Sequence, residues 1–347
     1  MLKHFGGSLL FTVFGLMLGG WYGWALYGTI DGMLGIVWIC AVLAVLEVSL
    51  SFDNAAVNAS VLKDMDPIWQ HRFLTWGIAI AVFGMRIVFP LLIVMVAARL
   101  GPVEALRLAL NSPAEYQRIV SGAHIGLMGF GGAFLGMVGL KYFFNVDKDV
   151  NWIEAIERPL AKIADIEALA IGLVLAATWA TSTMLVPDDA LTFFVAAIAG
   201  LLTYLAVEIV NHVLQPPTPT TGAIAKAGFG AFLYLEVLDA SFSFDGVIGA
   251  FALTNNLIVI AIGLGIGAMF VRSMTVFLVH KGTMSQYRYL ETGAFYAIVA
   301  LAAIMYINTF AHIPEAITGL IGAVLIGLAF WASVRWNRAN SDGQGHS

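Results

Sequence analysis

Apolar runs of about twenty residues recur along almost the whole chain, each bounded by charges, prolines or polar clusters. A run of this length is what an α-helix needs to cross the hydrocarbon core of a bilayer. Only 11% of the 347 residues are charged, whereas soluble globular domains carry nearer a quarter. A large soluble core does not explain that deficit. The sequence therefore predicts an all-α, polytopic membrane protein with the lipid bilayer as its solvent.

The composition argues against several other classes. The single cysteine, Cys40, permits no intramolecular disulfide and no cysteine-based metal cluster. A net charge of -5 without a basic stripe argues against nucleic acid as a partner. Lys3 and His4, followed by an apolar run from Ser8, resemble a signal sequence in outline. We see no small-residue cleavage site after it and interpret it as the first retained span. No prosthetic group is expected.

The apolar runs predict ten membrane spans with short connections. Twelve Lys and Arg residues fall on the side of the N-terminus, and three fall on the opposite side. Because positive residues concentrate in cytoplasmic loops, we expect both termini to be cytoplasmic in a multi-pass protein of the inner (plasma) membrane. The expected spans are 8–28, 34–61, 73–97, 119–142, 165–185, 190–213, 227–253, 257–279, 290–310 and 315–334.

A polar motif occurs twice inside these spans. LEVSLSFDN, from Leu46, aligns with LDASFSFDG, from Leu238, in the pattern acid-x-Ser-apolar-Ser-Phe-Asp. The next span after each copy carries one arginine, Arg86 or Arg272. The copies lie five crossings apart and so run in opposite directions, which is typical of an inverted-topology repeat. We expect a five-plus-five bundle: a first membrane repeat, 1–187, with a cytoplasmic loop, 143–164, and a second repeat, 188–347, with a short cytoplasmic tail.

The polar residues of each motif follow a helical spacing with one exception. Residues three or four positions apart share one helix face. The first copy has Glu47, Ser51, Asn54 and Asn58, spaced i, i+4, i+7 and i+11, and the second has Glu236, Asp239, Ser243 and Gly246, spaced i, i+3, i+7 and i+10. Asp53 lies six residues after Glu47, and Asp245 lies six residues after Asp239. Each aspartate is therefore about 120° around an ideal helix from the earlier acid of its copy. Either the polar stripe is wide or the helix breaks there, and unwound backbone inside a membrane is tolerated where it lines a cavity.

The motifs carry more negative charge than their arginines neutralise. Each ionisable group in a span costs about 2.5–3.5 kcal/mol on insertion scales, so the surplus of acids requires protons or a cation. Oxygen donors without Cys or His suit a hard divalent ion such as Mg²⁺, Ca²⁺ or Mn²⁺. Polar residues that only hold helices together remain the alternative, and the arginines are either structural countercharges or direct participants. The predicted metal ligands are Glu47, Asp53, Asn54, Glu236, Asp239 and Asp245, supported by Ser51, Asn58, Ser243, Arg86 and Arg272.

Three features outside the motifs have simpler interpretations. Glu208 and His212 lie at i, i+4 near the end of span six, where they either bind a metal or extend toward the membrane surface. His124, in a glycine-rich stretch, is expected to be a buried structural histidine. The loop 143–164 contains an amphipathic turn ending at Arg158-Pro159, and QPPTPTTG, 215–222, is a linker that cannot continue a helix.

The two motifs resemble those of the TerC family of integral membrane proteins, named for tellurium resistance. The resemblance rests on LEVSLSFDNA, on YLEVLDASFSFDGVIGAFALTNN and on the arginines that follow. It implies kinship with small-ion transporters, among which TerC members are implicated in manganese export and metal homeostasis. This chain departs from the family at Gly246, where serine is usual, and it has more spans than the shorter members.

The leading hypothesis is therefore a secondary transporter that binds a divalent cation, with Mn²⁺ suggested by the resemblance, and exchanges it for protons. Export in particular rests on the resemblance. An intramembrane metal-dependent enzyme is an alternative, but no HExxH or GxSxG pattern is present, and we expect no enzymatic activity. A tellurium-resistance component without transport, or a membrane scaffold, is a further alternative.

Overall fold

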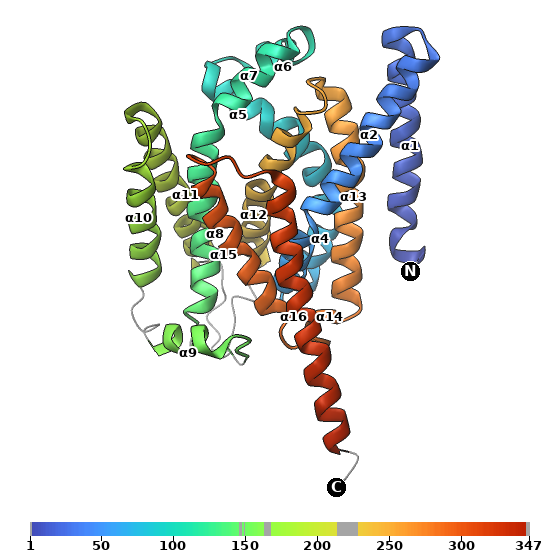
Figure 1. Ribbon diagram of the computed structural model, residues 1–347. Coiled ribbons are helices and arrows are strands. Elements are labelled where there is room, and N and C mark those ends of the chain that lie inside the picture. The colour runs from blue at the N-terminus through green and yellow to red at the C-terminus, as the bar shows by residue number, and fades with distance from the viewer. Residues whose placement is uncertain (1, 146–147, 149, 163–167, 214–227, 345–347) are drawn as a thin grey trace. The chain divides into compact units, whose positions relative to one another are not determined.

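The computed structural model describes residues 2–145, 148, 150–162, 168–213 and 228–344. All regular structure in these ranges is helical. The elements, labelled as in Figure 1, are α1 (Leu2–Tyr27), α2 (Ile30–Leu50), α3 (Phe52–Leu62), α4 (Pro67–Ala79), the π-helix η1 (Ile80–Val88), α5 (Phe89–Ala98), α6 (Pro102–Asn111), α7 (Pro113–Gly122), α8 (His124–Phe143), α9 (Glu154–Lys162), α10 (Ala168–Ser182), α11 (Pro187–Val213), α12 (Gly228–Ala250), α13 (Leu257–His280), α14 (Thr283–Gln286), α15 (Leu290–Ile307) and α16 (Glu315–Gln344).

The predicted fold class is confirmed as a polytopic helical membrane protein. Within the described ranges, seven helices are long and apolar enough to cross a bilayer, and the pair Pro67–Gly77 and Val82–Ala98, bent by 51°, makes an eighth if it counts as one span. The apolar helix α10 is shorter, with 15 residues. Every predicted span overlaps a helix, and the count of ten spans stays a prediction.

Several predicted boundaries were wrong in detail. The second span, 34–61, is two helices separated at Ser51, and the third, 73–97, contains a π-helix. The connection after it folds into α6 and α7, each introduced by a proline at a first helical position, where the missing N–H is not needed. The predicted turn at Arg158-Pro159 is the helix α9, which continues through Pro159. The linker 215–222 lies outside the described residues.

The chain divides into two compact units that are interleaved along the sequence. The first unit comprises Met1–Ser51, His71–His124 and Asp239–Phe277, and the second comprises Phe52–Gln70, Ile125–Leu238 and Leu278–Ser347. Each unit therefore takes segments from both predicted halves, 1–187 and 188–347.

In the first unit, α13 packs on both α1 and α2. Its contacts with α2 advance in the same direction on both helices, from Cys40 against Val259 to Glu47 against Gly267. These two helices are therefore parallel. The contacts with α1 run in reverse order, from the Phe5 and Phe277 rings through Ser8 and Ser273 to Tyr22 and Asn256. Hence α1 is antiparallel to α13, and α1 and α2 form a hairpin (Figure 1).

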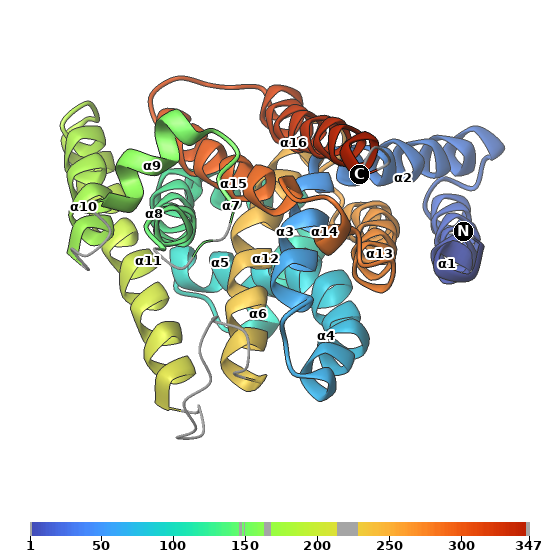
Figure 2. The same cartoon turned by 90° about the horizontal axis from the view of Figure 1, so that it is seen from below.

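In the second unit, α8 lies between α11 and α15 (Figure 2). Small residues on α8 permit this close packing: a Cβ on Gly129 would lie 2.6 Å from the Phe193 carbonyl oxygen of α11, and one on Gly139 would lie 2.4 Å from Val299 of α15. The order in which contacts occur along the helices shows that α8 is parallel to α11 and antiparallel to α15. These directions match those that the ten-span prediction assigns to spans four, six and nine.

The connector between α8 and α10 is fixed by one buried carboxylate. Glu157, 1% exposed, pairs with Lys148 and accepts hydrogen bonds from the backbone N–H groups of Trp152 and Ile153 and from the Tyr296 hydroxyl. Burial lowers the pKa of Lys148, and the pairing with Glu157 partly offsets that effect. The predicted cytoplasmic loop is therefore anchored to α15 in this part.

We expect Glu157→Ala to release this connector. The substitution leaves the Lys148 ammonium and two backbone N–H groups without their acceptor, and unsatisfied buried donors cost about 1–3 kcal/mol each. Limited proteolysis should then cut within 150–162 at least about tenfold faster than in the parent, since about 1.4 kcal/mol of local stability corresponds to a factor of ten. Glu154→Ala, which removes an exposed pair with Arg158, is the control. Equal cleavage rates in both variants would contradict the anchoring role.

Candidate functional site

The first motif contains a helix break, one of the two alternatives that the sequence left open. Helix α2 ends at Leu50, Ser51 adopts φ -105° and ψ 19°, and α3 begins at Phe52. The Ser51 backbone N–H still donates to the Glu47 carbonyl at 3.0 Å, so the interruption is a single residue. Asp53 thereby belongs to the first turn of a new helix. The second motif differs, because α12 runs unbroken from Gly228 to Ala250.

Glu47 is held in the first unit by two partners. Its carboxylate pairs with Arg86 and accepts a hydrogen bond from the Ser51 hydroxyl at 3.1 Å. Both charged residues are buried, with exposed fractions of 1% and 6%. Arg86 projects from the π-helix η1, a geometry that is rare and often found at functional sites. The structure thus brings Glu47, Ser51 and Arg86 together, and their part in a metal site stays a prediction.

The Glu47 side chain also contacts the second motif. A Cβ added at Gly246 would lie 2.8 Å from the Glu47 Oε2 atom. A larger residue at position 246 would displace this carboxylate. The contact gives a physical reason for glycine at the position where the first motif has Asn54. Thus α2 and α12 meet at their motifs within the first unit.

Asp53 and Asn54 are adjacent buried residues of the second unit, and each has a side-chain oxygen atom that can bind a cation. Their exposed fractions are 6% and 8%, and the Asn54 backbone N–H donates to Asp53 Oδ1 at 2.9 Å. The start of α3 favours a negative charge at Asp53, yet no ion pair of Asp53 occurs in the described part of the chain. The Asn54 Oδ1 atom is buried without a hydrogen-bond partner. A Cβ on Gly322 of α16 would lie 2.6 Å from Asp53 Oδ2, so the helices close tightly here.

The remaining predicted ligands are divided between the units. Glu236 lies in the second unit with Asp53 and Asn54, whereas Asp239 and Asp245 belong to the first with Glu47. The backbone of Asp245 is helical, but its side chain lies outside the described residues. Among the described residues, no group of three His, Cys, Asp or Glu side chains is close enough to hold a metal ion. The convergence of all six ligands on one ion stays a prediction. Of the supporting residues, Asn58 and Ser243 are buried, and Arg272 is half-buried in α13.

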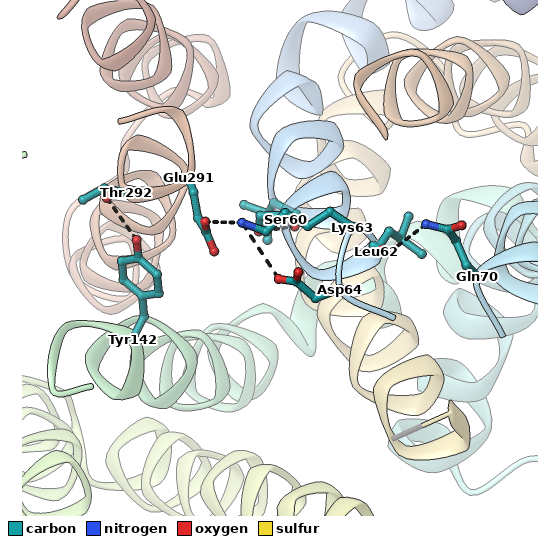
Figure 3. Close-up of polar contacts among 9 residues, drawn as sticks. Ser60, Leu62, Lys63, Asp64, Gln70, Tyr142, Glu291 and Thr292 are labelled. Atoms are coloured by element: carbon teal, nitrogen blue, oxygen red, sulfur yellow. Dashed lines mark hydrogen bonds and ion pairs between the residues drawn. The ribbon is translucent and has the colours of Figure 1, made fainter. Parts of the chain in front are cut away.

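The second unit also contains a cavity that the sequence did not predict. Its volume is about 450 Å³, and it opens among the ends of α3, α8, α11, α12 and α15. Lys63 follows α3 and reaches Glu291 on α15 and Asp64 beside it (Figure 3). The polar lining residues are Ser60, Asp64, Lys141, Tyr142, Asn145, Tyr204, Glu208, Asn211, His212, Tyr234 and Glu291.

Ion pairs and aromatic contacts hold the cavity lining in place. Glu208 pairs with Lys141 at 3.1 Å and lines the cavity together with His212. The Tyr142 ring stacks on the Phe295 ring with a centroid separation of 3.8 Å. The Tyr142 hydroxyl also forms a hydrogen bond with the Thr292 hydroxyl at 3.0 Å (Figure 3). His124, expected to be buried, is half-exposed at the start of α8. Only Glu208 and His212 had a sequence signal, their i, i+4 spacing, because the other lining residues come from separate helices.

These features define a membrane-embedded helical protein with buried acidic motifs and a polar cavity. The chain belongs to the family described as "Protein of unknown function (DUF475)", whose model matches residues 52–340. The match includes Asp53, Asn54 and the whole second motif. No curated protein and no solved structure matches the chain. The resemblance to the TerC family stays a hypothesis.

Proposed function

We propose that the chain is a secondary transporter of a divalent metal cation, bound by acidic side chains of the two motifs and exchanged for protons. Manganese is the first cation to test, because the resemblance to the TerC family suggests it. The same resemblance suggests export. The distribution of Lys and Arg residues supports both termini in the cytoplasm. A hard divalent ion fits donors that are all oxygen atoms.

The observation that carries the proposal is the pair Asp53 and Asn54. A buried carboxylate without a cationic partner is costly inside a membrane, and a buried amide oxygen without a hydrogen-bond donor is costly as well. Both costs fall when a cation supplies the missing positive charge. The break at Ser51 places Asp53 in the first turn of α3, and broken helices supply ligands at transporter binding sites.

The meeting of the two motifs supports the inverted repeat behind this proposal. Glu47 corresponds to Asp239 in the alignment of the motifs, and both residues belong to the first unit. Contact of Glu47 with Gly246 agrees with motif helices that face each other.

Transport by purified protein in liposomes tests the proposal. We expect Asp53→Asn to reduce the rate of Mn²⁺ movement by at least about tenfold, because losing one charged ligand costs at least about 1.4 kcal/mol of binding. Asp31→Asn removes a carboxylate from an exposed position on α2 and serves as the control. If Asp53→Asn moves Mn²⁺ as fast as the parent, Asp53 is not a ligand and the site assignment fails.

A further inference from the structure

One helix, α3, carries both Asp53 of the first motif and residues that line the cavity of the second unit. Helix α3 begins next to Asp53 and ends at Leu62, and Ser60, Val61 and Asp64 at its far end line the cavity. At 1.5 Å per residue, Asp53 lies about 14 Å along the helix axis from Leu62, the last residue of α3. Asn58, buried between them, places a further amide on the same short helix. The cavity and the buried donors thus share one structural element.

The cavity lining contains acids that are already paired. Glu208 is held by Lys141, and Glu291 and Asp64 are both held by Lys63. A bare divalent ion needs several free carboxylates at about 2–2.6 Å, and no such group is present among the described residues. The paired acids still leave the lining slightly negative, since three acids face two lysines. That charge attracts cations without binding them tightly.

Neutral oxygen and nitrogen groups occupy much of the remaining lining. Tyr142, Asn145, Asn211 and Ser60 offer hydrogen bonds to water, and the Asn211 Oδ1 atom is buried without a partner. A volume of about 450 Å³ far exceeds a bare ion and accommodates one with its first shell of waters. The lining therefore suits a cation that keeps its waters.

We propose that this cavity is the vestibule through which a hydrated divalent cation reaches Asp53, from the side predicted to be cytoplasmic. The inference rests on the proposed function and names the access route to its site. Passage requires binding favourable enough to admit an ion and weak enough to release it. The lysines paired with these acids reduce the negative charge of the lining, and they thereby weaken the binding of the cation.

Cysteine accessibility tests the vestibule, because Cys40 is the only cysteine and is fully buried. In a Cys40→Ala background, Val61→Cys places a thiol on the cavity wall, and Ala59→Cys, on the same helix with 0% exposure, is the control. A membrane-impermeant cationic thiosulfonate should label Val61→Cys from the cytoplasmic side only and leave Ala59→Cys unlabelled. Labelling should reduce Mn²⁺ transport at least about tenfold, and millimolar Mn²⁺ should slow the labelling.

The charge of the lining gives a second readout that does not depend on transport. The readout is the ratio of the labelling rate with a cationic reagent to the rate with an anionic one. This ratio should be about tenfold higher at Val61→Cys than for a free thiol in solution, since a charged cleft concentrates ions of the opposite charge. Glu208→Gln should reduce that preference. No labelling of Val61→Cys, or labelling that leaves transport unchanged, would overturn the vestibule alone. A parent chain that moves no divalent cation would overturn the proposed function, and the access route with it.

Discussion

Arg86→Met should destabilise the protein by about 3–5 kcal/mol, the usual effect of removing one partner of a buried ion pair. Glu47 is 1% exposed, and without Arg86 its carboxylate retains the hydrogen bond from the Ser51 hydroxyl. An uncompensated charge in apolar surroundings is far more costly than a lost contact. Denaturant unfolding in detergent, followed by tryptophan fluorescence, measures the change.

Two further variants separate charge from packing in this experiment. Glu47→Gln combined with Arg86→Met removes both charges, and we expect it to recover most of the lost stability. Arg118→Met breaks the exposed pair with Glu115, whose side chains are 78% and 53% exposed, and should change stability by less than about 1 kcal/mol. A double variant as unstable as Arg86→Met would show that the arginine acts by packing instead of by charge.

Gly267→Ala should separate α13 from α2. The added Cβ would lie 2.4 Å from the Glu47 Cβ and 2.8 Å from the Ala44 carbonyl oxygen. The second atom belongs to the backbone, so the helix itself must move. Overpacking of this kind costs about 1–3 kcal/mol or more, and the shift also displaces the Glu47 carboxylate from Arg86. Because Gly263 precedes Gly267 by four residues, the two form the small-residue seam that membrane helices use for close approach.

Gly35→Ala is the matched control for this variant. Gly35 lies inside α2, and an added Cβ would meet no atom within 4 Å. We expect it to be neutral or to stabilise the helix by up to about 1 kcal/mol, since alanine has the higher helix propensity. Thermal unfolding of the three proteins in the same detergent measures both effects. Equal melting temperatures for Gly267→Ala and the parent would mean that the helix pair is looser than this packing.

The sequence predicted the features that depend on local patterns. Apolar run lengths located the helices. The position of Asp53 off the polar stripe left two alternatives, a wide stripe or a helix break, and a break occurs at Ser51. The arginine in the span after each motif indicated either a countercharge or a direct participant in transport, and Arg86 pairs with Glu47. Such patterns are informative in a membrane protein because each ionisable residue inside a span has a free-energy cost. Its presence therefore indicates a partner or a function.

Features that depend on packing between distant segments were not predictable. The contact of Glu47 with Gly246 joins residues far apart in the chain, and a glycine gives no sign of its neighbour. The cavity draws residues from the ends of five helices, and most of them looked like ordinary residues at span ends. The π-helix around Arg86 also has no distinct sequence pattern, because one widened turn changes the register by only one residue.

The interleaved units have a consequence for how the protein is made. Segments of the first unit leave the ribosome in the order Met1–Ser51, His71–His124 and Asp239–Phe277. Glu47 is therefore synthesised long before Gly246 and Gly267, the two glycines that close over it. Arg86, in contrast, follows Glu47 by only 39 residues. During biosynthesis the arginine is thus the earliest partner for that acid, and a nascent chain lacking it would hold a bare carboxylate until most of the protein had been translated.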